Sequence, residues 1–327
     1  MIKEPRKLPH IKINRPIELA KRIGVPLEIL EKVAADPKKH FHSWSAETRG
    51  KRRTFHQAEH DLEAIHDKLD KEILDRFDFP PEFQGAIKGR SLRSNALRHV
   101  GKKNIAGFDI KNYFPSVKPK KVYNTFVQLG CQPDVARLIT RLVTADGCLP
   151  QGYKTSPKVA ALVLLPVQRR IAGLTKGLKV SQSFWVDDLA LSGSYPLRKL
   201  KPSIKKIFKQ SGFTAHKDEN FPVYRDTRQV VTGVVVNDKP SVKKEIREEV
   251  EKIVFLSEKN GLRQYKRQHT PNLGLVKLGQ KVSGRISNMV SIDSEKYKDL
   301  QERWDAVLEK AGVVPAKEEA KSKSTAN

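Results

Sequence analysis

The chain has 327 residues, of which 63 are Lys or Arg and 37 are Asp or Glu, so its formal net charge is +26. This positive charge is spread along the whole sequence and indicates a polyanionic partner, above all a nucleic acid. Two cysteines, Cys131 and Cys148, are too few for a disulfide framework and favour the reducing cytoplasm. The longest apolar run, residues 160–167, is too short to cross a bilayer, and no signal peptide is expected, which argues against a membrane role.

The first half of the chain begins with helical patterns. Apolar residues at helical spacing predict two short helices within residues 17–35 and a clearer amphipathic helix over residues 59–77. A basic stretch, residues 48–55, separates them. An apolar strand is then expected at residues 104–110, followed by a helix over residues 119–129 that starts at a proline.

The second half alternates between strand and helix patterns. The expected segments are a helix over residues 157–173 that Ser156 can cap, two short strands joined by a tight turn within 184–193, a basic helix over 197–210, a β-branched strand over 229–237, and helical patterns over 241–265 and 294–312. The irregular order of strands and helices predicts an α+β fold.

Three carboxylates interrupt or end apolar strands. Asp187 and Asp188 lie in FWVDDLALSG (184–193), where two strands and a turn would bring them to a hairpin tip, and Asp109 ends the strand NIAGFD. Together they could hold two Mg²⁺ ions about 3.5–4 Å apart, an arrangement that serves in-line phosphoryl transfer. Without cations, mutual repulsion would raise at least one of their pKa values. A solvated surface turn is the alternative for two adjacent aspartates.

Five short motifs occur in one order along the chain. They are FDIKNYFPSV (108–117), LPQGYKTSP (149–157), WVDD (185–188), GFTAHKDE (212–219) and VVTGVVVN (230–237). Because the five motifs occur in this order, the chain resembles a reverse transcriptase, which is an RNA-directed DNA polymerase. Each match alone is weak, and their shared order carries the resemblance.

The retron type of reverse transcriptase fits best. SNALRH (94–99) is similar to an Asn-Ala-x-x-His element upstream of the first motif, VTG (231–233) to a Val-Thr-Gly element, and GRISNMVSID (284–293) to the retron thumb. The resemblance implies a right-hand polymerase fold, with an antiparallel palm sheet that carries the aspartates and a helical thumb. It also implies dNTP substrates, a structured noncoding RNA that supplies template and priming 2′-hydroxyl, an RNA–DNA product, and an effector protein in antiphage defence.

The resemblance also implies a division of the chain. The expected parts are an N-terminal helical extension at 1–45, fingers at 46–104, a palm at 105–240 with an inserted fingers segment at about 118–156, a thumb at 241–313, and a disordered tail at 314–327.

Roles for individual residues follow from the same resemblance. Asp109, Asp187 and Asp188 are the expected catalytic metal ligands, with the carbonyl of Ile110 beside them. The expected nucleotide-binding residues are Lys51, Arg53, Phe114, Gln151, Gly152 and Lys217. The expected nucleic-acid-binding residues are Asn95, His99, Trp185, Arg263, Lys266 and Arg267.

Several of these roles have simple structural alternatives. Phe114 is expected to block the nucleotide 2′-hydroxyl, although it could be a core aromatic. Lys51 and Arg53 suit a triphosphate, or a solvated basic loop. The two histidines of HQAEH (56–60) have the spacing of a zinc helix, but Gln57 takes the place of the glutamate that a metalloprotease needs.

The sequence departs from the family pattern in places and leaves alternatives open. Trp185 replaces the usual tyrosine, Ala161 an asparagine and Ala58 a proline. A reverse transcriptase of a group II intron or a diversity-generating element is one alternative, although no maturase or endonuclease region is expected. A catalytically silent RNA-binding scaffold of a defence complex is the other, and the three retained aspartates argue against it.

Overall fold

The computed structural model describes residues 10–48, 50–216 and 222–313. The chain divides into two compact units, residues 1–90 with 104–222 and residues 91–103 with 223–327, and each has its own hydrophobic core. Helices and antiparallel sheets are mixed, which confirms the α+β class. The expected tail lies outside the described residues.

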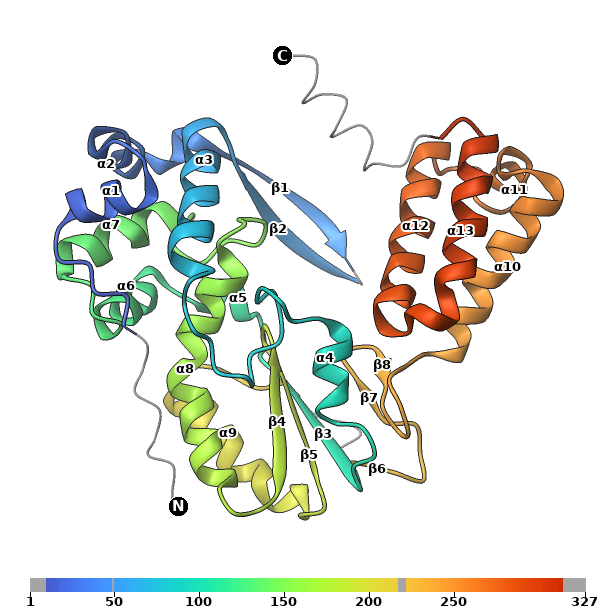
Figure 1. Cartoon of the computed structure of the whole chain (residues 1–327). Coiled ribbons are helices and arrows are strands. Elements are labelled where there is room, and N and C mark those ends of the chain that lie inside the picture. The colour runs from blue at the N-terminus through green and yellow to red at the C-terminus, as the bar shows by residue number, and fades with distance from the viewer. Residues whose placement is uncertain (1–9, 49, 217–221, 314–327) are drawn as a thin grey trace. The chain divides into compact units, whose positions relative to one another are not determined.

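Three strands of the first unit pair antiparallel in the order β4–β5–β3 (Figure 1). They are β3 (Asn104–Asp109), β4 (Val180–Trp185) and β5 (Asp188–Gly193). The tight turn between β4 and β5 falls at the paired aspartates, as the sequence predicts. Most side chains of these three strands are buried, among them Phe108, Leu189 and Leu191.

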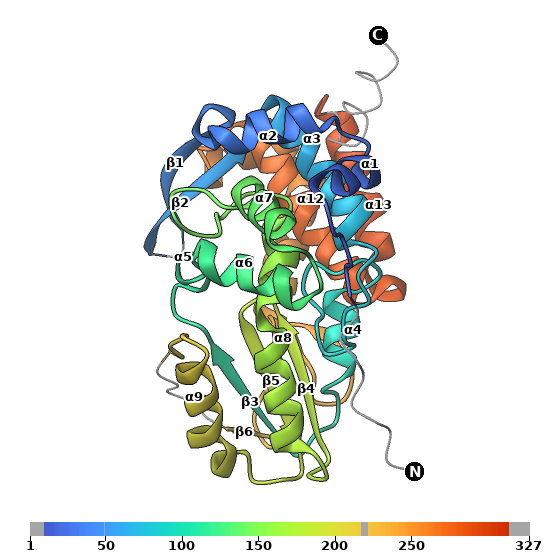
Figure 2. The same ribbon diagram turned by 90° about the vertical axis from the view of Figure 1, so that its left-hand side faces the viewer.

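Two helices lie against this sheet, and Figure 2 shows α8 in front of β4 and β5. They are α8 (Ser156–Thr175) and α9 (Lys201–Gln210), which follows a short turn, η3 (Leu197–Leu200). Most of α8 is apolar and buried, and the helix continues through Pro166. The expected helices at 157–173 and 197–210 are therefore confirmed, although Thr155 rather than Ser156 precedes α8.

The remaining helices of the first unit pack beside this layer. They are α1 (Pro16–Ile23), α2 (Leu27–Ala35), η1 (Pro37–His40), α3 (His60–Leu69), the π-helical turn η2 (Asp70–Leu74), α5 (Tyr113–Ser116), α6 (Pro119–Gln128) and α7 (Pro133–Val143). The paired helices near the N-terminus, the amphipathic helix and α6 match the sequence patterns. α7 was not predicted from the sequence, although its seven buried residues lie on one face.

A long hairpin occupies the basic stretch between α2 and α3. It consists of β1 (Phe41–Thr48) and β2 (Lys51–Ala58), which pair antiparallel over their whole length. Its side chains are largely exposed, so no alternation between apolar and polar residues marks it in the sequence.

The second unit is built on four consecutive helices. They are α10 (Lys244–Asn260), α11 (Leu262–His269), α12 (Leu275–Ile292) and α13 (Ser294–Lys310). Trp304 is completely buried among them and donates a hydrogen bond from Nε1 to Ser283 Oγ at 2.9 Å. Helices were expected for most of this region, but α12 was not among them.

The second unit also contains α4 (Leu92–Leu97) and short strands. The strands are β6 (Val223–Tyr224), β7 (Val230–Val231), β8 (Val234–Val235) and β9 (Ser241–Val242), and β7, β8 and β9 form an antiparallel sheet. The single strand expected at 229–237 is therefore wrong. Thr232 and Gly233 adopt positive φ angles of 49° and 85°, which fold this segment into a tight hairpin.

None of the described helices combines the length and the apolar character needed to cross a membrane.

Candidate active site

Three carboxylates meet at one end of the sheet in the first unit. Asp109 is the last residue of β3 and lies opposite Asp188, the first residue of β5, in the antiparallel ladder. Asp187 precedes Asp188 in the turn that follows β4. The structure thus brings together the three aspartates that the sequence analysis singled out.

The turn that carries Asp187 is tight and strained. Val186 has a φ angle of 58°, which is unusual for a β-branched residue. Such a conformation persists only where the surrounding structure determines it. A neighbouring segment must therefore hold the turn in this conformation.

Residues 82–85 provide that support. Phe184 donates from its backbone N–H to the carbonyl of Glu82, and the N–H of Gln84 donates to the carbonyl of Phe184, both at 2.7 Å. The rings of Phe83 and Phe184 stack with their centroids 5.2 Å apart. A Cβ atom on Gly85 would lie only 2.7 Å from the backbone nitrogen of Val186, so glycine permits this close approach.

The carboxylates are desolvated and repel one another. Burial, together with the charges of Asp109 and Asp187, raises the pKa of Asp188 to about 7. Burial, with the charge of Asp109, also raises the pKa of Asp187 to about 6, against the opposing effects of Arg53 and His216. The pKa of Asp109 is raised by burial too, against the opposing effects of His216, Lys51 and Arg53.

The donor set suits a divalent cation, although the described residues contain no ready cluster of metal ligands. Hard carboxylate oxygens are the ligands that Mg²⁺ prefers, and a cation would offset the repulsion that raises these pKa values. In the described part of the chain, no group of three or more His, Cys, Asp or Glu side chains is placed so that it could hold a metal. Metal binding by the three aspartates therefore stays a prediction.

His216 is a neighbour of the site that the sequence analysis missed. Its Nε2 lies 3.5 Å from Asp109 Oδ2, and its backbone N–H donates to the carbonyl of Asp109 at 2.8 Å. Ile110 pairs with Ala215 in the same short bridge. His216 belongs to the motif GFTAHKDE, in which the sequence indicated a role for Lys217 instead, and Lys217 lies outside the described residues.

Lys51 and Arg53 lie at the beginning of β2. They are two residues apart on one strand, so their side chains leave the same face of the hairpin. Both lower the pKa of Asp109, and Arg53 also lowers that of Asp187, which places their positive charge within electrostatic reach of the carboxylates. The structure therefore brings this expected pair to the same site.

Phe114 and its neighbour Tyr113 lie in α5, directly after β3. Phe114 is half-buried, whereas Tyr113 is buried and donates a hydrogen bond from its hydroxyl to the carbonyl of Ala160 at 2.6 Å. Burial and the charge of Asp187 raise the pKa of Tyr113. Tyr113 thus joins α5 to α8 beside the carboxylates, and Phe114 is carried on this anchored turn.

Gln151 and Gly152 contact the hairpin strand β2. The N–H of His56 donates to the carbonyl of Gln151 at 2.8 Å. Gly152 has a φ angle of 120°, and a Cβ atom there would lie 2.3 Å from the carbonyl oxygen of His56. This contact within the protein requires glycine at position 152, whatever else approaches it. The nucleotide-binding role of both residues stays a prediction.

Trp185 is the last residue of β4 and pairs with Asp188 across the ladder. It is half-buried. The structure places it next to the carboxylates, as the motif predicts, and its contact with nucleic acid stays a prediction.

Asn95 and His99 lie in the second unit and are both buried. Asn95 donates from Nδ2 to Thr232 Oγ1 at 2.9 Å, and burial lowers the pKa of His99 to about 3. The Asn95 contact lies within the protein, and both side chains have almost no exposed surface. Their expected role in nucleic-acid binding stays a prediction.

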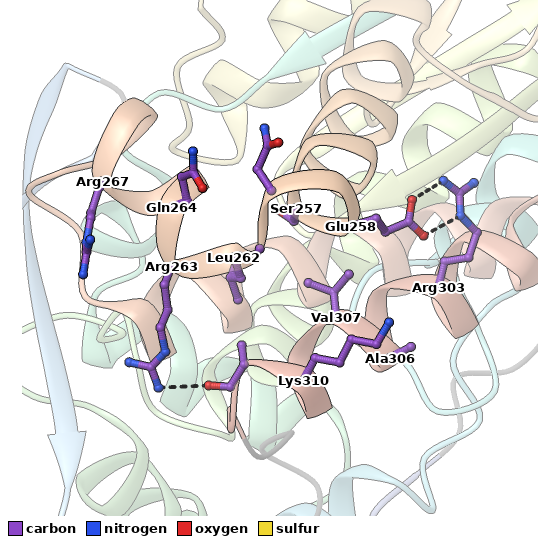
Figure 3. Close-up of a pocket in the computed structure, with 13 residues that line it drawn as sticks. Ser257, Glu258, Leu262, Arg263, Gln264, Arg267, Arg303, Ala306, Val307 and Lys310 are labelled. Atoms are coloured by element: carbon purple, nitrogen blue, oxygen red, sulfur yellow. Dashed lines mark hydrogen bonds and ion pairs between the residues drawn. The ribbon is translucent and has the colours of Figure 1, made fainter.

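Arg263, Lys266 and Arg267 lie on α11, also in the second unit. Lys266 donates to the carbonyl of Pro271 at 2.8 Å, whereas Arg263 and Arg267 line a pocket (Figure 3). The three basic residues of this expected nucleic-acid-binding group therefore do not share one environment.

Several known proteins are similar in sequence to this chain. The chain is 28% identical to Retron Mx162 reverse transcriptase of Myxococcus xanthus over 254 residues, which are 67% of this chain and 52% of that protein. It is 26% identical to Retron Se72 reverse transcriptase of Salmonella heidelberg, covering 83% of this chain and 73% of that protein. It is 25% identical to Retron Ec86 reverse transcriptase of Escherichia coli, covering 88% of each.

The chain is related to the retron reverse transcriptases. The matched region spans about half the length of the Myxococcus relative and most of the Escherichia relative. No protein-family model matches the chain. Among solved structures, a chain of an "RdRp complex" matches with a TM-score of 0.46 and 12% identity, covering 73% of this chain and 26% of that one.

Proposed function

We propose that this chain is an RNA-directed DNA polymerase of retron type, a nucleotidyltransferase. The observation that carries the proposal is the meeting of Asp109, Asp187 and Asp188 at one end of the sheet, in a chain related to retron reverse transcriptases. Binding RNA without catalysis would not require three carboxylates that burial and mutual repulsion destabilise.

The carboxylates would hold the catalytic cations, together with the carbonyl of Ile110. Two Mg²⁺ ions, when bound there, would activate the attacking hydroxyl and stabilise the charge that develops on the phosphates. The protein's own contribution is to keep the three carboxylates together and desolvated. Residues 82–85 serve this by holding the strained turn that carries Asp187.

The residues around the carboxylates would position the incoming dNTP. Lys51 and Arg53 bring positive charge that suits a triphosphate, and guanidinium can form paired hydrogen bonds to phosphate oxygens. Phe114 would exclude a 2′-hydroxyl and so select deoxynucleotides. Gln151 and Gly152 would support the nascent base pair from the segment that contacts β2.

The same proposal divides the chain into the fingers, palm and thumb of a right-hand polymerase. The hairpin β1–β2 would belong to the fingers, the sheet β4–β5–β3 to the palm, and the helices α10 to α13 to the thumb. Trp185, beside Asp188, would contact the primer end, and the basic residues of α11 would contact RNA.

The retron type also implies a particular template, a particular primer and a partner protein. The template would be part of a cognate structured noncoding RNA, and synthesis would start from an RNA 2′-hydroxyl, which leaves DNA joined to RNA. We propose a cytoplasmic protein that acts with an effector in antiphage defence. The relationship to retron reverse transcriptases supports these claims.

The experiment that tests the function expresses the chain with its flanking DNA and examines the extracted nucleic acid. A short single-stranded DNA joined to RNA is expected, and it should be absent from the Asp187→Asn, Asp188→Asn double variant. Purified protein should also extend a DNA primer on an RNA template. If the intact protein makes no DNA in either assay while both proteins bind RNA equally, the chain is a scaffold and the proposal fails.

A further inference from the structure

Three aromatic rings lie in a row on one face of the hairpin β1–β2. Trp44 and Phe55 are directly opposite each other in the ladder, and their rings stack with centroids 5.8 Å apart at an interplanar angle of 25°. The ring of His42, two residues before Trp44 on the same strand, lies 5.3 Å from that of Trp44 at 28°. Trp44 is nevertheless 43% exposed, so part of this large flat side chain is open to solvent.

Stacking within the hairpin does not by itself explain an exposed indole. A two-stranded hairpin is marginally stable in water, and an aromatic pair across the strands strengthens it. The opposite face, however, already anchors this hairpin, because His56 is buried there and its Nε2 lies 2.8 Å from Asp146 Oδ2. Trp44 is therefore not needed to attach the hairpin, and its face is available to a ligand.

The same face carries the two cations that approach the carboxylates. Lys51, Arg53 and Phe55 alternate along β2, so their side chains leave the strand on one side, and the ladder places Trp44 on that side too. Lys51 and Arg53 both act to lower the pKa of Asp109, which brings this face of the hairpin within electrostatic reach of the candidate active site. The rings thus continue a surface that already suits phosphates.

The spacing along β2 places the rings close to the expected position of the nascent base pair. Arg53 and Phe55 are two residues apart, which is about 7 Å along a strand. Successive bases of a stacked strand are about 3.4 Å apart, so this step corresponds to about two bases. Phe55 also pairs with Gln151, a residue proposed to support the nascent pair, in a short parallel bridge.

An unpaired nucleobase is the occupant that fits this face. Proteins bind single-stranded nucleic acid by stacking bases on exposed aromatic rings while nearby cations meet the phosphates. The bases of a duplex are already stacked on one another, and an incoming base is paired with the template. At a polymerase site, the template strand ahead of the nascent pair is the segment that presents unpaired bases.

We propose that Trp44, supported by Phe55, stacks on the first unpaired base of the template strand ahead of the nascent pair. This inference rests on the proposed function, because it identifies part of the template path of the polymerase. Stacking on Trp44 competes with base pairing, so it favours the opening of RNA structure ahead of the site. Trp44 is then a binding residue that determines how well structured templates are copied.

A binding experiment without catalysis tests the stack. The protein in EDTA is titrated with DNA primers annealed to RNA templates that extend beyond the primer by one or by two nucleotides. The first extra nucleotide is the templating base, and the second should meet Trp44. The second nucleotide should raise the affinity of wild type about tenfold. Trp44→Val, which keeps a residue that favours strands, should lose this gain, and Trp44→Phe, which keeps a ring, should retain most of it.

Two controls identify the contact. An abasic second nucleotide should remove the gain from wild type and make it bind like Trp44→Val, because no base is left to stack on the indole. Ser45→Val changes an exposed position on the opposite face of the same strand and should keep the wild-type gain. Binding of the template with one extra nucleotide, which does not reach Trp44, reports whether each variant is folded.

Primer extension then measures the opening of RNA structure. The rate through a stable RNA hairpin placed directly ahead of the primer is divided by the rate on an unstructured template. This ratio should fall about tenfold in Trp44→Val, as expected for the loss of one base–aromatic stack, and should stay at the wild-type value in Ser45→Val.

The results separate the stack from the polymerase activity. If the second nucleotide adds the same affinity in Trp44→Val as in wild type, or if the abasic nucleotide leaves the difference between them unchanged, the rings serve only the hairpin and the proposal is overturned. An unchanged ratio of rates in Trp44→Val would overturn the role in opening structure. If wild type makes no DNA but still binds the second nucleotide through Trp44, only the proposed function is overturned.

Discussion

Asn95 donates a hydrogen bond from Nδ2 to Oγ1 of Thr232, across 137 positions of sequence, at 2.9 Å. Asn95 is buried on α4, and Thr232 lies in the tight turn of the β7–β8 hairpin. The Asn-Ala-x-x-His and Val-Thr-Gly elements, which carry the retron resemblance, are therefore in direct contact. This contact gives a structural reason for both elements within one unit.

Replacing Thr232 by Val should leave the buried amide of Asn95 without its acceptor. We expect a loss of about 1–3 kcal/mol in the free energy of unfolding, measured by urea denaturation. Thr232→Ser keeps the oxygen and should stay close to wild type. If the Thr232→Val and Thr232→Ser variants have the same free energy of unfolding, the hydrogen bond makes no measurable contribution to stability.

Replacing Asp188 by Asn should abolish DNA synthesis and yet stabilise the protein in EDTA. Burial and the neighbouring carboxylates raise the pKa of Asp188 to about 7, so at pH 8 its ionised form is unfavourable in the folded state. Removing the charge should raise the free energy of unfolding at that pH by about 1–3 kcal/mol. Urea denaturation at pH 8 checks this, with the exposed Asp238→Asn as the control. If Asp188→Asn is less stable than wild type under these conditions, the crowded carboxylates do not destabilise the folded protein.

Replacing Gly85 by Ala should slow catalysis because it displaces the turn that carries Asp187, and not because it changes a contact with the substrate. The added Cβ would lie 2.7 Å from the nitrogen of Val186, so the turn that carries Asp187 must move. We expect the DNA synthesis rate to fall about tenfold or more, because catalytic groups tolerate little displacement. Primer extension under single-turnover conditions measures this.

Gly107→Ala is the matched control for that experiment. A Cβ at position 107 in β3 meets nothing within 4 Å, so its rate should stay close to wild type. Equal effects at positions 85 and 107 would show that the strain at Val186 has no role in placing Asp187.

Replacing Phe114 by Ala should admit ribonucleotides. Phe114 is half-buried on the turn anchored by Tyr113, next to the carboxylates, so truncation opens space without removing the anchor. The preference for dNTP over NTP, as the ratio of kcat/KM values, should fall about tenfold or more if a steric clash sets it. Val122→Ala, on the buried face of α6, is the control for general loosening and should keep the wild-type preference. An unchanged sugar preference in Phe114→Ala would remove its selective role.

The carboxylates of the site could be predicted from the sequence, but the residues that surround and hold them could not. Asp109, Asp187 and Asp188 could be located because each lies at the end of a short apolar run that reads as a strand. Gly85 and His216 could not be found in this way, since their importance comes from contacts with distant segments. The hairpin β1–β2 was missed because its strands are exposed on most positions, and α12 because weak helix formers occur within it.

His66 should make the first unit sensitive to mild acid. It is almost fully buried, its Nε2 bonds the carbonyl of Leu142 at 2.7 Å, and its ring lies 4.5 Å from that of Tyr153. Burial lowers its pKa to about 4. Between this value and the ordinary pKa of about 6.5, the unfolded chain binds a proton that the folded chain does not. Stability should therefore fall as the pH falls through this window.

The variant His66→Gln removes this titration. Wild type should lose about 1–2 kcal/mol more stability than His66→Gln between pH 7 and pH 5, as measured by urea denaturation at both values. His10→Gln, at an exposed position, is the control and should keep the wild-type pH dependence. His66→Gln is itself expected to be less stable at pH 7, because a buried hydrogen bond is altered, so the slope with pH and not the absolute value decides. Parallel curves for wild type and His66→Gln would mean that His66 is protonated in the folded protein as readily as in the unfolded chain.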